Sequence, residues 1–127
     1  MKTRIVVLAI AALGLAIGVN AQQAGSSRGI LQISSASVEG LDIVTAMHVY
    51  RGAVTEPRHT HPGDVSGFVL EGRLTVVRAD QPSVSLTAGQ TFFVPSGVAH
   101  NIISAGAARI VATYFVEQGK PLAVGAD

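Results

Sequence analysis

The sequence predicts a small all-β protein with one domain. Short apolar runs rich in β-branched residues alternate with turn residues, and no stretch after residue 21 keeps a helical periodicity. Their regular spacing favours an antiparallel sandwich or barrel. At 127 residues the chain has room for one core of ordinary size. The expected strands cover residues 30–34, 41–50, 66–70, 74–78, 84–86, 91–94, 101–104 and 109–116.

The first 21 residues have the pattern of a secretory signal peptide. Lys2 and Arg4 precede an apolar run over residues 5–19, and Val19 and Ala21 place small side chains where signal peptidase needs them. The run is shorter than the roughly 20 apolar residues of a spanning helix, which disfavours an uncleaved anchor. We therefore expect cleavage after Ala21, export to the periplasm or the medium, and no membrane association afterwards.

The remaining chain is expected to consist of a flexible leader over residues 22–28, which is small and polar, and one domain over residues 29–127. Cleavage leaves seven Lys and Arg residues against eight Asp and Glu residues, so the charge is near zero and nucleic acid is not expected as a partner. Because the sequence has no cysteine, a metal site would need His, Asp or Glu ligands.

Two histidines two residues apart are the first sign of a site. The side chains of His59 and His61 project from the same face of an extended segment, so both imidazoles can reach one ion. Such pairs also occur by chance in exposed loops. The surrounding sequence therefore has to decide between a ligand pair and two unrelated histidines.

Two motifs supply that context. HTHPGDVSGFVLEG covers residues 59–72, and GQTFFVPSGVAH covers residues 89–100. Together they resemble the two motifs of the cupin superfamily, and most of all those of small single-domain cupins with an HPG turn. The resemblance implies a cupin fold, a jelly-roll-like barrel or double-stranded β-helix. It also implies that His59, His61 and His100 meet at the barrel mouth as metal ligands.

The first motif departs from the cupin pattern at the position of the usual fourth ligand. Counting back from Gly72, Val65 stands where a glutamate is expected. Asp64 is adjacent, but neighbouring side chains in a strand point to opposite faces, so Asp64 would replace the glutamate only in a distorted turn. Six residues instead of the usual five separate Gly52 from His59, which predicts a longer loop.

Three interpretations of the site stay open, in this order: a three-histidine metal centre, a barrel that binds ligands without metal, and histidines that satisfy hydrogen bonds in the core. Three neutral imidazoles can hold a divalent ion of Fe, Zn, Ni, Mn or Cu and leave coordination positions open. Without a carboxylate, the charge of the ion favours an anionic oxygen ligand such as an enolate, a carboxylate or hydroxide.

Strand alternation assigns the side chains around the site. Val65, Gly67 and Val69 fall on the same face as the histidines and are expected to form an apolar, roomy wall for a small ligand. Phe68 and Leu70 fall on the other face and are assigned to the core or to a homodimer interface.

The other aromatic residues and His48 are harder to place. The inward register of Phe92, Phe93 and Tyr114 is not fixed by the pattern, and one of them is expected to line the pocket while the others pack in the core. His48 lies outside both motifs and is interpreted as a hydrogen-bonded strand residue.

The leading functional hypothesis is a metal-dependent enzyme, dioxygenase-like or isomerase-like, acting on a small oxygenated or aromatic compound by dioxygen activation or Lewis-acid-assisted proton transfer. No catalytic residue is assigned, and only Asp64 and Glu56, on flanking loops, are candidates for a general base. The alternative is a non-enzymatic module that binds a small molecule or a metal. In both hypotheses the partner is a small-molecule ligand.

Overall fold

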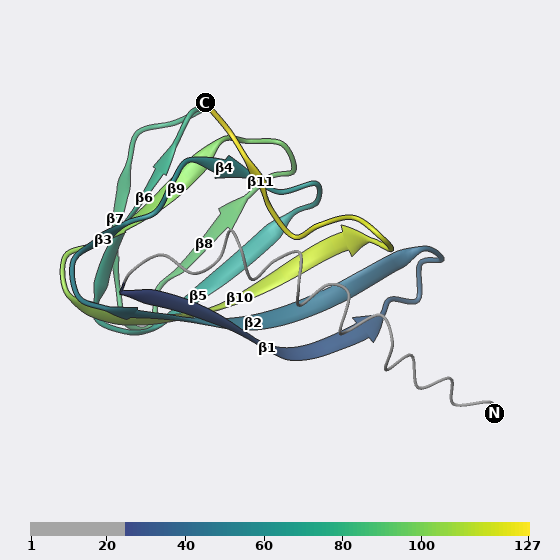
Figure 1. The fold of residues 1–127 in the computed structure, drawn as a ribbon, viewed down its shortest axis with the longest axis horizontal. Helices are drawn as coiled ribbons and strands as arrows, with labels where there is room; N and C mark the ends of the chain where they lie inside the picture. Colours follow the sequence, from purple (N-terminus) through teal and green to yellow (C-terminus); the bar gives the residue numbers. More distant parts are fainter. Residues whose placement is uncertain (1–24) are drawn as a thin grey trace.

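The computed structural model describes residues 25–127, so the expected signal peptide and the first residues of the expected leader lie outside the described residues. The described chain forms eleven strands in two antiparallel sheets that face each other (Figure 1). Their bounds are β1 Ser26–Ser35, β2 Leu41–Arg51, β3 Val54–Thr55, β4 His59–Thr60, β5 Val65–Glu71, β6 Arg73–Arg78, β7 Val84–Thr87, β8 Thr91–Val94, β9 His100–Ser104, β10 Ala107–Glu117 and β11 Val124–Gly125. Over these residues no helix is long and apolar enough to cross a membrane.

The order of the strands confirms the jelly-roll-like barrel. One sheet has the order β1-β2-β10-β5-β8, and the other has the order β11-β4-β9-β6-β7 with β3 paired to β9 (Figure 1). Strands distant in sequence are neighbours, since β10 lies between β2 and β5. This arrangement brings β4 and β9, which carry the two motif histidines His59 and His100, side by side.

All eight predicted strands are present, most of them with slightly wider bounds. The prediction missed β3, β4 and β11. Each has only two residues, and two residues are too few to show an alternation of apolar and polar side chains.

The leader is the part of the domain division that needs correction. Residues 26–28, which we expected in the flexible leader, begin β1, where Ser26 lies opposite Tyr50 and Arg28 lies opposite His48. Small polar residues have a low strand propensity, so the composition gave no sign of this strand. Its order comes from backbone hydrogen bonds to β2, which do not depend on apolar side chains.

The inward faces of the two sheets form two apolar clusters. The larger one contains Tyr50, Val54, Val69, Leu74, Val76, Leu86, Val94, Ile102, Ala108 and Ile110. The smaller one contains Val44, Ala46, Val65, Ala112, Tyr114, Val116 and Leu122. Phe68 and Leu70 are exposed on the outer face, which rules out the core among the two expected locations. Phe93 is also exposed, whereas Tyr114 is buried and Phe92 packs against the larger cluster.

The turn after His61 depends on a glycine. A Cβ at Gly63 would overlap the carbonyl oxygen of Phe115 in β10. We expect Gly63→Ala to lower the free energy of unfolding by about 2 kcal/mol, because the turn and β10 would have to move apart. Urea denaturation measures the change. Gly52→Ala is the matched control, since nothing lies within 4 Å of a Cβ there. Equal stability of the two variants would contradict the close packing of this turn.

Candidate metal centre

Three histidines from two neighbouring strands and one turn meet at one end of the barrel. His59 begins β4, His61 follows β4 directly, and His100 begins β9. His59 and His100 are cross-strand partners. One ligand atom from each of the three side chains lies within 4.8 Å of the other two. The structure thus brings together all three ligands that the cupin resemblance implies.

A backbone carbonyl holds the Nδ1 atom of each imidazole. The pairs are His59 with Pro57 at 2.9 Å, His61 with Leu122 at 2.6 Å and His100 with Val98 at 2.9 Å. Because a carbonyl oxygen only accepts hydrogen bonds, each Nδ1 carries the hydrogen and each neutral ring offers the lone pair of its Nε2. Metal-binding histidines are typically oriented in this way.

His61 and His100 are the two buried histidines, and a divalent ion would fit between their rings. The Nε2 atoms of His61 and His100 are 3.1 Å apart. Since both atoms carry lone pairs, this approach is repulsive unless a cation lies between them. Two nitrogens bound about 2.1 Å from one ion would be separated by roughly 3.0 to 3.4 Å at bond angles of about 90 to 109°. The observed separation falls within this range.

Burial keeps these two rings neutral. Desolvation is the main cause that lowers the pKa of His61 to about 3 and that of His100 to about 4. Nearby positive charges, including His59, shift each pKa in the same direction, and the hydrogen bonds to the Leu122 and Val98 carbonyls oppose them. A shared proton therefore does not separate the two Nε2 atoms near pH 7. The neutral imidazole is also the form that binds a metal, so the site is ready to accept an ion without first losing protons from these two ligands.

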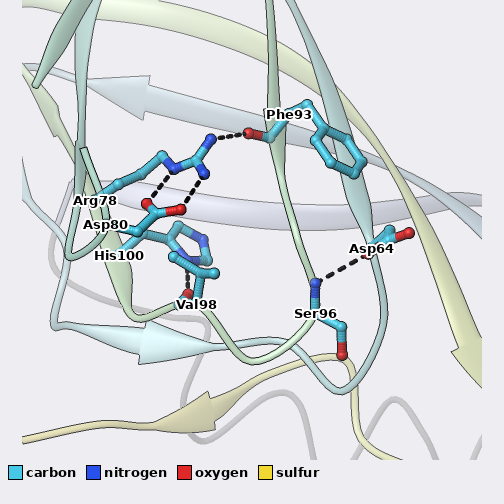
Figure 2. A network of polar contacts seen from close by, with 7 residues as sticks. All are labelled: Asp64, Arg78, Asp80, Phe93, Ser96, Val98 and His100. Atoms are coloured by element: carbon cyan, nitrogen blue, oxygen red, sulfur yellow. Dashed lines mark hydrogen bonds and ion pairs between the residues drawn. The ribbon is translucent and has the colours of Figure 1, made fainter. Parts of the chain in front are cut away.

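In the described part of the chain no carboxylate joins the three imidazoles. Val65 is buried and belongs to the same apolar cluster as Tyr114 and Leu122. Asp64 is exposed, and its Oδ1 accepts a hydrogen bond from the backbone N–H of Ser96 at 2.9 Å (Figure 2). Asp64 therefore holds the neighbouring turn and does not replace the missing glutamate.

Polar contacts also fix the segment that leads to His100. Arg78 of β6 lies opposite His100 in β9. Its guanidinium donates two hydrogen bonds to the carboxylate of Asp80 and a third to the backbone carbonyl of Phe93, at 2.6 Å (Figure 2). These contacts tie β6 to the end of β8, from which the turn to His100 begins.

The residues that line the cleft beside the histidines differ from those predicted to form its wall. It has a volume of about 180 Å³ and is lined by residues 26–28, His48, residues 56–59 and residues 123–125. Val65, Gly67 and Val69 do face inward, as strand alternation predicts, but all three are buried in packed core. The ring of Phe92 covers Gly67 so closely that no roomy wall remains. His59 is the histidine of the metal centre that faces the cleft.

Three residues that line the cleft, Arg28, His48 and Glu56, place polar groups beside the metal centre. His48 Nε2 and Tyr114 Oη are 2.7 Å apart, and the Tyr50 hydroxyl donates a hydrogen bond of 2.6 Å to Glu56 Oε1. Arg28 has a buried Nε without a hydrogen-bond partner. His48 and Tyr50 share one face of β2, so alternation could have placed His48 inward. The sequence carried no comparable sign for Arg28.

The two facing sheets define a small jelly-roll-like barrel, and at one end of it three histidines are placed so that they could hold a metal ion. Residues 45–117 match the cupin domain family, and the chain belongs to this family. No curated protein matches the chain.

Solved structures with the same fold have low sequence identity to this chain. A cupin superfamily protein from Desulfitobacterium hafniense DCB-2 has 16% identity and a TM-score of 0.60, over 92% of this chain and 94% of that one. KdgF from Halomonas sp. has 18% identity and a TM-score of 0.62, over 76% and 82%. An oxalate oxidase in complex with the substrate analogue glycolate has 24% identity and a TM-score of 0.66, over 84% and 58%. At these identities the likeness concerns the fold alone.

A glutamate at position 65 should add a fourth ligand. Val65 lies opposite Tyr114 in β10, and the Tyr114 ring is 5.2 Å from the His61 ring. We expect Val65→Glu to tighten Zn²⁺ binding at least tenfold, because a carboxylate offsets the charge of the ion. Without metal, the buried carboxyl should lower the free energy of unfolding by about 3 kcal/mol.

Thermal melts with and without Zn²⁺ check this prediction, since metal binding to the folded state raises its stability. Val65→Gln is the matched control, because the amide has nearly the same shape and no charge. If Val65→Glu and Val65→Gln bind Zn²⁺ equally well, position 65 does not face the metal centre.

Proposed function

We propose that the protein is a metal-dependent enzyme that acts on a small oxygenated compound, with the ion held by His59, His61 and His100. The carrying observation is that backbone carbonyls fix all three Nδ1 atoms and leave the Nε2 lone pairs of His61 and His100 facing each other at 3.1 Å. Histidines that only satisfied core hydrogen bonds would gain nothing from this repulsive approach. A cleft of small-ligand size lies directly beside His59.

Within the proposed enzyme, Glu56 is the residue that takes a proton from the substrate. When bound, the divalent ion supplies Lewis acidity to a substrate oxygen. Glu56 lines the same cleft as His59, and the Tyr50 hydroxyl holds one of its oxygens at 2.6 Å. Burial raises the pKa of Tyr50, so its hydroxyl stays protonated and donates to the carboxylate. The second oxygen of Glu56 is left to accept a proton, which favours isomerase-like chemistry.

The test is deuterium exchange next to a carbonyl group. Metal-loaded protein is incubated in D2O with a panel of 2-hydroxy, 2-keto and 1,3-dicarbonyl compounds of up to six carbons, and NMR follows exchange at carbon. We expect exchange that requires metal and falls at least 100-fold in Glu56→Gln, because a general base is lost. Glu71→Gln is the matched control, since Glu71 lies in an exposed hairpin. Metal affinity should be equal in all three proteins.

Other outcomes of the same experiment point to different functions. Oxygen uptake without carbon exchange would replace proton transfer by dioxygenase-like chemistry. Stoichiometric metal binding with neither exchange nor oxygen uptake would favour the alternative, a non-enzymatic module that binds a small molecule or a metal. The absence of a carboxylate ligand is the observation that favours this alternative.

We also propose that the protein is exported, because Lys2 and Arg4 precede an apolar run that ends in the small residues before Gln22. Expression of the full chain in a bacterium with export machinery should give a product that begins at Gln22. Mass spectrometry of the secreted and periplasmic fractions measures this. A product that retains Met1 would contradict the proposal.

A further inference from the structure

We propose that Arg28 is the anion-binding residue of the cleft, and that the ligand is a small carboxylate whose second oxygen group reaches the metal centre. The inference deepens the proposed function and rests on it for the contact with the metal. The contact between the ligand and Arg28 does not depend on the proposed function. It is supported by observations on β1 and on the walls of the cleft.

Arg28 lies inside the barrel mouth with no charged partner. It is opposite His48 in β2 and shares the inward face with that residue, and both line the cleft. Its Nε is buried and makes no hydrogen bond. None of the three ion pairs found among residues 25–127 includes it. A guanidinium with no ion-pair partner and a buried, unsatisfied Nε–H is costly, which indicates that the position serves a ligand.

The charges around the cleft favour an anion. Arg28 and Arg58 line it, and Glu56 is the only carboxylate among its lining residues. Glu56 is already hydrogen-bonded to Tyr50 and forms no ion pair with either arginine. A divalent ion at the histidines would add two further positive charges. A monoanion or dianion would therefore be attracted, and a cation would be repelled.

The position of the Arg28 charge relates it to the metal centre. Arg28 is the cross-strand partner of His48, and His48 Nε2 lies 2.7 Å from Tyr114 Oη. The Tyr114 ring in turn lies 5.2 Å from the His61 ring, so these contacts connect Arg28 to the metal centre. One ligand can span the distance between Arg28 and an ion beside His59, because both residues line one continuous cleft.

The size of the cleft and the hydrogen-bond donors that line it narrow the range of possible ligands further. A volume of about 180 Å³ corresponds to roughly six water molecules in the liquid, which suits a small ligand. A single planar guanidinium matches the two oxygens of one carboxylate. Ser26 and Ser27, on the same strand, also line this wall.

The experiment measures binding of three probes of similar size by calorimetry: succinate, propionate and the neutral succinamide. Each is titrated into Zn²⁺-loaded protein and into metal-free protein. We expect succinate to bind the loaded protein best, since it can occupy Arg28 and the metal together, and succinamide to bind least. Arg28→Gln should weaken succinate binding 10- to 100-fold and remove the preference for succinate over propionate.

Two further variants separate charge from structure. Arg28→Lys keeps the charge and should recover part of the affinity, whereas Arg109→Gln removes an exposed arginine of β10 outside the cleft and should bind as wild type does. Succinate affinity unchanged in Arg28→Gln, or reduced equally in Arg109→Gln, would overturn the proposal.

The metal-free arm distinguishes the two proposals. One outcome is that the protein takes up no Zn²⁺ and still binds carboxylates in a way that depends on Arg28. That result would support the anion site and contradict the metal-dependent function. If Arg28→Gln does not fold, the Arg28 Nε–H resonance of the wild-type protein serves instead. We expect it to shift on addition of succinate and not of succinamide, and an identical response to both would overturn the proposal.

Discussion

The hydrogen bonds from the three imidazole Nδ1 atoms to backbone carbonyls are the interactions on which the site depends. Two of these carbonyls, at Pro57 and Val98, lie two residues before the histidine that they orient, so local chain geometry supplies them. The third belongs to Leu122, which is distant in sequence. Its position requires the chain after β10 to fold back over the barrel, where the Leu122 side chain packs in the smaller apolar cluster. The metal centre is therefore a product of the complete fold and not of the motifs alone.

The sequence was sufficient for the fold, because strands leave periodic patterns, and its resemblance to cupins was sufficient to name three histidines that lie close together. Eight strands long enough to alternate were predicted, and His59, His61 and His100 followed from two motifs. The ligand cleft was not predictable in the same way. The alternation of side chains along the strand predicts that Gly67 faces inward. It does not predict that the ring of Phe92, from the neighbouring strand, fills the space above Gly67. That outcome depends on packing between side chains that no local pattern encodes.

The three clustered histidines and the proposed anion-binding residue come from different parts of the chain. The segment that matches the cupin domain, residues 45–117, contains all three histidines and Glu56. Arg28 and the cleft residues 123–125 lie outside that segment. Only the first three residues of β1 fell in the expected leader, because these polar residues pair through the backbone. The three clustered histidines thus lie within the family segment, whereas Arg28 and one wall of the cleft belong to the peripheral strands β1 and β11.

The contact between Leu122 and His61 links the end of the chain to the metal centre. β11, which is followed by two residues, pairs with β4, and the Leu122 carbonyl just before it accepts a hydrogen bond from the His61 ring. If this terminal strand detaches, His61 loses its acceptor, and its ring is free to rotate and to exchange tautomers. The pairing of this short strand with β4 therefore couples the order at the end of the described barrel to the orientation of one of the three histidines.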